Sequence, residues 1–390
     1  MIVLECKLKG KLGQYQLLDE AIRTALFVRN KALRFWLDNR GVGRKELMRY
    51  NTQLRAEFEW CKKLNSHAGQ ASVDRAWFAI TRFYANCKAQ TKGKKGFPNF
   101  KKRGHSVEYK TSGWQLSTGK KFLTFTDGFK AGKFKLIGTR NLNFYAVDKI
   151  KRVRVVKKAD GYYAQFIINI ERQEKHESTG KQIGIDLGLE FFYTDSNGEI
   201  VSNPRYLRKS ERSLKRQQRR VSSKQKGSRN RRKAINKLAR KHLKVSRQRR
   251  DFAVKTARAL VQSSDWVVYE DLKVKNLVKN HHLAKSISDA SWSIFVEWLE
   301  YFAKIYNVPI RAVAPHYTSQ NCSGCNSVVK KSLSTRTHQC SCGVSLHRDW
   351  NAAKNILAKG LSTDGQSGIN AWGQNTLYPK LETVLDKVTG

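Results

Sequence analysis

The sequence predicts a multidomain α+β fold, and three observations lead to that prediction. The chain has 390 residues, which is more than twice the typical size of one domain, roughly 150 residues. Apolar residues make up 40% of it, which is enough for packed cores rather than a disordered basic tail. Stretches with apolar residues at helical spacing alternate with stretches of strand-like alternation. The chain therefore combines helices and sheets in more than one unit.

The net charge is the most informative global feature. Lys and Arg number 76 and Asp and Glu 31, so the formal net charge is +45. Such a surface repels itself unless a polyanion binds it, and nucleic acid is the obvious one because its phosphates release counterions to Lys and Arg. An anionic membrane surface and simple solubility are the alternatives. We favour nucleic acid because the basic residues are spread along the chain and interleaved with aromatics, whereas a membrane-surface protein more often concentrates them on one amphipathic helix. We expect no membrane span, since no run approaches the ~18 apolar residues that one needs.

We expect a cytoplasmic location in a prokaryotic cell. The apolar stretch at the start of the sequence is too short, and too interrupted by charged residues, for the hydrophobic region of a secretory signal. Seven cysteines in the whole chain are too few, and odd in number, for a disulfide scaffold.

The N-terminal part is predicted to be a small β-barrel or sandwich with a helical insertion. Residues 1–10 read as a strand, and residues 11–90 carry apolar stripes at helical spacing without a proline. Residues 105–172 alternate like several short strands separated by turns. We therefore assign residues 1–10 and 91–175 to the sheet domain, with the helices inserted after its first strand.

A basic, aromatic loop follows the helical segment. Residues 91–103 hold six basic residues, two phenylalanines and the breakers Gly93, Gly96 and Pro98. Phe97 and Phe100 either stack on bases or anchor the loop in a core. We expect nucleic-acid contacts from Lys94, Lys95, Phe97, Lys101, Lys102 and Arg103.

Residues 205–250 are more basic still, with 21 Lys or Arg against one acid, Glu211. They read as two basic helices joined near Gly227 and Ser228. A basic run is often only a solvated face, but this excess is larger than solubility requires, which favours phosphate contact. The expected contacts include Arg216, Arg219, Arg220, Arg231, Arg232, Arg247 and Arg250.

Three acids lie where a sheet of one topology would bring them together. Residues 183–201 contain three consecutive strands, and helix, strand, helix, strand and helix follow, which is the ribonuclease H-like order. Asp186 and Glu270 then lie near the carboxyl ends of parallel strands, and Asp349 begins a helix that can face them. Singly, each acid could be a turn residue or a helix cap.

Clustered carboxylates repel one another unless protons or cations neutralise them. Oxygen ligands suit Mg²⁺ or Mn²⁺, and two such ions support phosphodiester cleavage. Asp186, Glu270 and Asp349 are therefore the predicted catalytic residues and ligands of two ions. Arg348 either orients a scissile phosphate or makes a helix-end salt bridge.

Four cysteines in two pairs predict one structural Zn²⁺. Cys322–Cys325 and Cys340–Cys342 have the paired spacing of zinc knuckles. The second pair is one residue tighter than usual, so His338 or His347 could replace a thiolate. A disulfide is the main alternative and is disfavoured inside a cell. The predicted ligands are Cys322, Cys325, Cys340 and Cys342, whereas Cys6, Cys61 and Cys87 are expected to be reduced core residues.

The motifs at these positions resemble the TnpB family, transposon-encoded RNA-guided DNA nucleases related to type V CRISPR effectors. The resemblance covers residues 1–358. Two departures concern the zinc element: Asn326, where the family has glycine, and the short Cys340–Cys342 knuckle. The motifs are, in order, Phe97–Lys101, Gly184–Gly188, Val268–Leu272, Tyr317–Cys325 and Arg348–Ala353.

The resemblance implies a wedge-type β-barrel, a helical recognition segment and a RuvC nuclease domain at residues 180–358. That domain carries the basic helices of residues 205–250 and a zinc element at residues 317–346, and residues 359–390 form a flexible tail. The resemblance also implies two nucleic-acid partners. One is a guide RNA encoded beside the gene, and the other is double-stranded target DNA that is recognised next to a short motif.

We therefore expect an RNA-guided, metal-dependent DNA endonuclease encoded by a transposable element. One alternative is a guided DNA-binding repressor without cleavage, which the presence of all three acids disfavours. Another is a strand-joining transposase or accessory transposition protein.

Overall fold

The structure, a computed structural model, describes residues 1–90, 93–138, 141–332 and 335–362. Two compact units make up these residues, the first Met1–Arg172 and the second beginning at Gln173. Of the predicted C-terminal tail, residues 359–362 continue the last helix, and the remainder lies outside the described residues. Among the helices described, none combines the length and the apolar character needed to cross a membrane.

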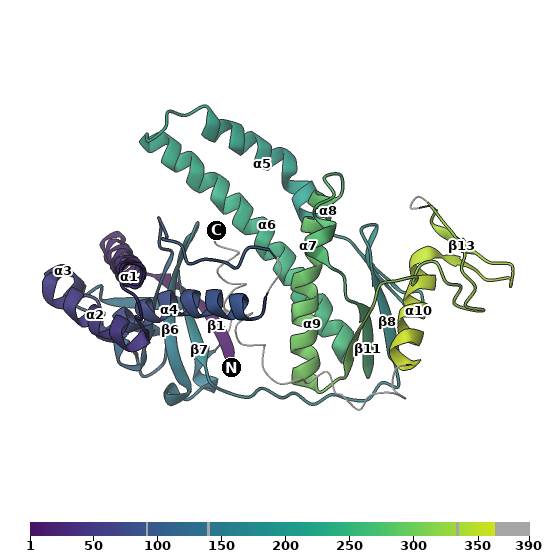
Figure 1. Ribbon diagram of the computed structural model, residues 1–390, viewed down its shortest axis with the longest axis horizontal. Coiled ribbons are helices and arrows are strands. Elements are labelled where there is room, and N and C mark those ends of the chain that lie inside the picture. The colour runs from purple at the N-terminus through teal and green to yellow at the C-terminus, as the bar shows by residue number, and fades with distance from the viewer. Residues whose placement is uncertain (91–92, 139–140, 333–334, 363–390) are drawn as a thin grey trace. The chain divides into compact units, whose positions relative to one another are not determined.

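The first unit is built on a seven-stranded antiparallel sheet in the order β2-β6-β7-β1-β5-β4-β3 (Figure 1). Its two edge strands, β2 and β3, are consecutive in sequence and separated by the three-residue turn Thr111–Gly113. These two edge strands do not pair with each other, so the sheet is a half-barrel, which agrees in part with the small barrel or sandwich expected. The strands are β1 (Ile2–Lys9), β2 (Ser106–Lys110), β3 (Trp114–Leu116), β4 (Phe122–Phe125), β5 (Lys133–Ile137), β6 (Ile150–Lys158) and β7 (Gly161–Ile168).

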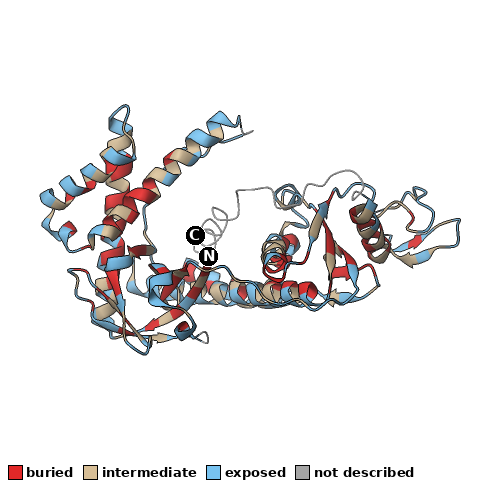
Figure 2. Ribbon diagram, turned by 90° about the horizontal axis from the view of Figure 1, so that it is seen from below, coloured by how far each residue is buried: buried red, intermediate tan, exposed pale blue. Residues whose placement is uncertain are grey.

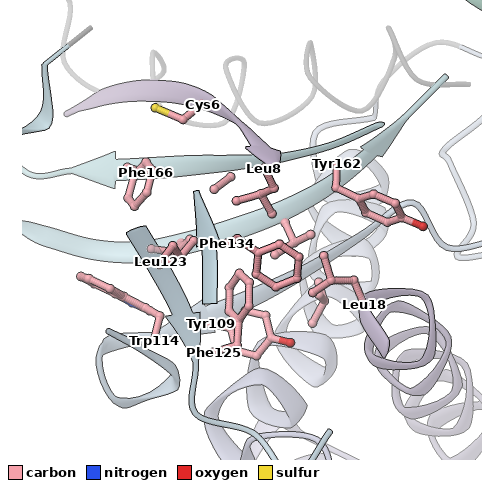
Figure 3. Close-up of a cluster of buried hydrophobic side chains, with 14 of the residues drawn as sticks. Cys6, Leu8, Leu18, Tyr109, Trp114, Leu123, Phe125, Phe134, Tyr162 and Phe166 are labelled. Atoms are coloured by element: carbon pink, nitrogen blue, oxygen red, sulfur yellow. The ribbon is translucent and has the colours of Figure 1, made fainter. Parts of the chain in front are cut away.

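Alternation along β1 explains how this sheet forms its core. Every second residue from Ile2 to Leu8 is buried, because successive side chains of a strand point to opposite faces. Figure 3 shows Leu8 beside Phe134, with Leu18 reaching the same cluster from a helix. Phe134 and Phe166 are fully buried there.

The segment predicted to be helical forms four helices. They are α1 (Leu12–Asp38), α2 (Arg44–Glu57), α3 (Glu59–Lys62) and α4 (Ser66–Lys88). One stripe of α1, with Leu18 and Ile22, packs on the sheet. Another stripe, with Val28 and Leu33, packs against α2 and α4 in a second core. The amphipathic period of α1 thus attaches the insertion to the sheet.

The second unit has a five-stranded mixed sheet in the order β10-β9-β8-β11-β12. β8, β9 and β10 form an antiparallel meander, and β8, β11 and β12 run parallel, as the order of elements predicted. The strands are β8 (Gln182–Leu187), β9 (Phe191–Asp195), β10 (Ile200–Ser202), β11 (Trp266–Glu270) and β12 (Ile310–Val313).

The remaining elements of this unit are helices and one small hairpin. The basic segment forms two helices separated near Gly227, and the second extends further than expected, to Gln262. The elements are α5 (Tyr206–Ser222), α6 (Arg229–Gln262), α7 (Val274–Leu277), α8 (Ala284–Ala290), α9 (Trp292–Tyr306), α10 (Arg348–Ser362), β13 (Thr337–Gln339) and β14 (Ser345–His347).

Helices cover both faces of this sheet. Ile183 and Ile185 of β8 pack in one core with α6 and α9, while Val268 of β11 packs on the other face with α10. Figure 1 shows β8 and β11 between α9 and α10, and Figure 2 shows buried residues concentrated on the strands and the helix faces that meet them.

Two glycines allow α10 to lie directly on the sheet. A β-carbon on Gly184 of β8 would lie 2.4 Å from the Ala353 carbonyl oxygen of α10. A β-carbon on Gly360 of α10 would lie 2.4 Å from a methyl carbon of Val268. Neither space can hold a methyl group, so glycine is required where helix and strands touch.

We predict that Gly184→Ala destabilises the second unit by about 3 kcal/mol, because the added methyl overlaps backbone atoms that cannot rotate away. The unfolding midpoint should fall by at least about 5 °C in thermal denaturation. Gly119→Ala is the control, since the space around that glycine is open. Equal midpoints for the two variants would contradict the close approach of α10.

Candidate active site

The register of two parallel strands places Asp186 beside Glu270. Tyr269 of β11 pairs with Ile185 of β8, so the next positions along the two strands are Glu270 and Asp186. Side chains two residues apart share a face, which puts both acids on the face of Gly184 and Val268, where α10 packs. Both acids therefore point to the side of the sheet that α10 covers.

Helix α10 brings the third acid to this edge. Asp349 is in its first turn and is 6% exposed. One carboxylate oxygen of Asp349 lies 3.6 Å from the position of a β-carbon on Gly188, two residues after Asp186. Arg348 is paired with Asp349, with 3.4 Å between Nε and Oδ1. The structure thus gathers all three predicted acids at the carboxyl ends of β8 and β11.

Asp186 is the acid on which the other two carboxylates act. Burial, and then the negative charges of Glu270 and Asp349, raise the pKa of Asp186 well above its ordinary value, while Arg348 opposes them. Burial also raises the pKa of Glu270, against a hydrogen bond from Thr318. Since only cations relieve such repulsion without protonation, the donor set fits hard divalent ions.

Thr318 belongs to this site although the linear sequence placed it only inside a motif. Its hydroxyl donates to Oε1 of Glu270 at 2.5 Å, and the residue is 4% exposed. No signal in the linear sequence connects it to an acid 48 positions away.

The four predicted zinc ligands form a cluster. Their sulfur atoms lie within 4.8 Å of one another, and all seven cysteines are free thiols. A hydroxyl and a backbone N–H of Ser327 lower the pKa of Cys325 to about 6, which favours the thiolate that a metal binds. This geometry suits one tetrahedral Zn²⁺. Among the described residues the three carboxylates form no group as tight as this one.

The two histidines considered as alternative ligands lie outside the cluster. Nδ1 of His338 contacts the ammonium of Lys331, and Nδ1 of His347 accepts a hydrogen bond from the Asp349 backbone. Of the remaining cysteines, Cys6 and Cys61 are buried as expected. Cys87 is exposed, so its assignment to a core is wrong: it lies in the last turn of α4, beyond the packed stripe.

The basic loop presents most of its predicted contacts to solvent, namely Lys94, Lys101, Lys102 and Arg103, while Lys95 is half-buried. Phe97 is partly packed and partly exposed. Its ring meets that of Phe83 edge-on, with 5.1 Å between the ring centroids, yet the residue is 50% exposed, so part of it remains open to a base. Asn30 of α1 holds the loop by accepting from the Lys101 backbone N–H and donating to its carbonyl.

The basic helices place most of their predicted arginines on exposed faces. Arg216, Arg219 and Arg220 alternate with buried Leu214, Gln217 and Val221 along α5, so one face packs on α6 and the other is open. Arg232, Arg247 and Arg250 are exposed on α6, and Arg231 is half-buried.

The base of this helical pair is held by a buried acid, Asp289 of α8. Its carboxylate accepts from the backbone N–H groups of Leu207 and Arg208 at the start of α5, at 2.8 and 3.0 Å. It also accepts from Nε of Arg249 on α6 at 2.9 Å. One carboxylate thus caps α5 and neutralises a cation of α6.

Two family models match the second unit and its margin. Residues 165–281 match the family described as probable transposase, OrfB_IS605. Residues 292–356 match the Cas12f1-like TNB domain. The two matches together include Asp186, Glu270, Asp349 and the four clustered cysteines.

Curated relatives extend the similarity. A "Putative RNA-guided DNA endonuclease" of Streptomyces pristinaespiralis is 41% identical over 187 residues, which is 47% of this chain and 46% of that protein. The match thus spans about half of that relative's length. "Putative RNA-guided DNA endonuclease InsQ" of Escherichia coli K12 is 27% identical over 322 residues, or 78% of this chain and 77% of that one.

Among solved structures, the cryo-EM structure of a Cas12f1–sgRNA–target DNA complex aligns with a TM-score of 0.55. The alignment covers 89% of this chain and 83% of that one at 15% identity, so it shows likeness of fold. The family models and the curated relatives agree with the resemblance predicted from the motifs: this chain is similar to proteins described as RNA-guided DNA endonucleases and TnpB-like proteins.

Proposed function

We propose that the protein is an RNA-guided DNA endonuclease that depends on divalent metal ions. The observation that carries this proposal is the meeting of Asp186, Glu270 and Asp349 at one edge of the second sheet. The relatives described as RNA-guided DNA endonucleases support it, as does the net charge of +45.

In this proposal the three carboxylates hold two Mg²⁺ or Mn²⁺ ions in a RuvC-type site. Bound there, such ions activate water and stabilise the leaving 3′ oxygen of a phosphodiester. The protein's own contribution is to keep the three acids together: Glu270 and Asp349 are buried, Asp349 is carried by α10, and Glu270 accepts a hydrogen bond from Thr318. Arg348 already pairs with Asp349, and we propose that it also orients the scissile phosphate.

The basic surfaces would hold the nucleic acids. The open arginine face of α5 and α6 has the character of a backbone-binding surface, and the loop before β2 adds lysines beside Phe97. In this division of labour a guide RNA encoded beside the gene reads the target by base pairing, and the protein reads a short adjacent motif.

We predict that Asp186→Ala abolishes cleavage and preserves guided DNA binding, because it removes a cation ligand without touching the basic surfaces. Cleavage of labelled duplex DNA and filter binding by the same guide-loaded preparation measure the two activities. Asp251→Ala is the matched control, since that acid is exposed and forms an ion pair with Lys255 one helical turn away. Retained cutting by Asp186→Ala would defeat the assignment.

Replacement of Arg216, Arg219 and Arg220 by alanine is expected to weaken guide binding without changing folding, because all three are exposed on α5. The logarithm of the association constant falls linearly with the logarithm of the salt concentration. The magnitude of this slope should decrease by roughly 0.7 to 0.9 for each phosphate that the variant no longer neutralises. Titrations at several salt concentrations measure this slope. Lys255→Ala with Lys304→Ala, which also removes exposed cations, serves as the control. An unchanged slope in the arginine variant would remove α5 from the interface.

The cysteine cluster is expected to carry one zinc ion per chain, measurable by elemental analysis of protein purified without chelator. Cys325→Ser should lose the ion. Residues 317–346 should then become sensitive to protease, because the ion would join the two cysteine pairs of that segment. Cys87→Ser should keep the ion, since Cys87 is exposed and outside the cluster. Intact protein without zinc would contradict the proposed site.

The family description "probable transposase" supports a second candidate, a protein that assists transposition or joins DNA strands. An assay that separates strand transfer from simple breaks distinguishes the two. Joined products in the presence of donor ends would favour this candidate over the nuclease.

A further inference from the structure

The loop that carries the first cysteine pair also reaches the acids. Thr318 lies four residues before Cys322, and its hydroxyl donates to Oε1 of Glu270 at 2.5 Å. Both residues are buried, at 4% and 6% exposure. Since Oε1 accepts this hydrogen bond, the carboxylate is held in one orientation, and Oε2 keeps its full capacity for another partner.

Two buried asparagines of α10 hold this loop in place. Nδ2 of Asn355 donates to the carbonyls of Thr318 and Asn321 at 2.8 and 2.7 Å. Asn351 donates to the same Asn321 carbonyl at 2.8 Å and accepts from the Ser323 backbone N–H at 2.9 Å. The backbone of Thr318 is therefore fixed to the helix that also supplies Asp349.

These contacts form one continuous hydrogen-bonded connection. It runs from the cysteine loop through Asn351 and Asn355 to Thr318 and then to Glu270. The asparagines are 0% and 9% exposed, so water competes little for these bonds. Hydrogen bonds from hydroxyl to carboxylate are charge-assisted and are among the stronger ones in proteins.

We propose that Thr318 is a positioning residue that orients the Glu270 carboxylate toward the cation site. The proposal rests on the proposed function, in which Glu270 is a metal ligand. The threonine does not itself bind the ion: it fixes which oxygen of Glu270 faces it. Ligand orientation by an outer hydrogen bond strengthens metal binding about 10–100-fold in other sites.

The test compares Thr318→Val, which keeps the shape of the side chain and removes the hydroxyl, with Thr318→Ser, which keeps the hydroxyl. Mn²⁺ binding to each variant, loaded with guide and non-cleavable DNA, is measured by electron paramagnetic resonance. The Mg²⁺ concentration for half-maximal cleavage is measured separately. We expect the Mn²⁺ dissociation constant and the half-maximal Mg²⁺ concentration to rise about tenfold in Thr318→Val. Both should stay within twofold of wild type in Thr318→Ser.

Zinc content and the unfolding midpoint separate orientation from folding. If Thr318→Val loses zinc or unfolds at a lower temperature, Thr318→Ala, which has a smaller side chain, replaces it in the comparison. The Mn²⁺ dissociation constant and the Mg²⁺ concentration for half-maximal cleavage are then measured for that variant. A wild-type protein that neither binds Mn²⁺ nor cleaves contradicts the proposed function itself. A wild-type protein that does both, with a hydroxyl-free variant that matches it in both constants, contradicts only the role of Thr318.

Discussion

The close packing of α10 on β8 and β11 is the constraint on which the candidate site depends. Gly184 and Gly360 remove the side chains that would keep this helix at an ordinary distance. As a result the first turn of α10, with Asp349, lies at the ends of the strands that carry Asp186 and Glu270. A larger residue at either glycine would move the third acid from the first two.

This arrangement has an electrostatic cost. Burial, and then the charges of Glu270 and Asp349, raise the pKa of Asp186 although the chain as a whole is strongly cationic. Most of the basic residues thus do not neutralise these acids: many lie on exposed helix faces, where polyanions can reach them. Under the proposed function, the exposed basic residues would hold nucleic acid and the three acids would hold cations at the sheet edge.

Buried polar contacts organise the second unit around this edge. Asp289 fixes the start of α5 and a cation of α6, while Asn351 and Asn355 fix the cysteine loop to α10. Each of these side chains exchanges hydrogen bonds with water for internal ones, which makes the position of a loop or helix specific. The basic helices and the cysteine element are in this way attached to the same sheet that carries the acids.

The linear sequence by itself predicted most of the local elements and named the candidate site residues. Short apolar runs predicted the strands from Gln182 to Val313, and apolar residues three or four apart predicted the helix Trp292–Tyr306, since that spacing follows from helix geometry. The spacing of the cysteines predicted their cluster, because neighbours in a tight turn stay neighbours in space. Tertiary structure alone decided what depends on distant contacts: that the first sheet is a half-barrel, that Cys87 is exposed, that Thr318 reaches Glu270, and that α10 lies close enough to bring Asp349 to the strands. The physical reason is that such contacts join residues tens to hundreds of positions apart, where no local period carries information about them.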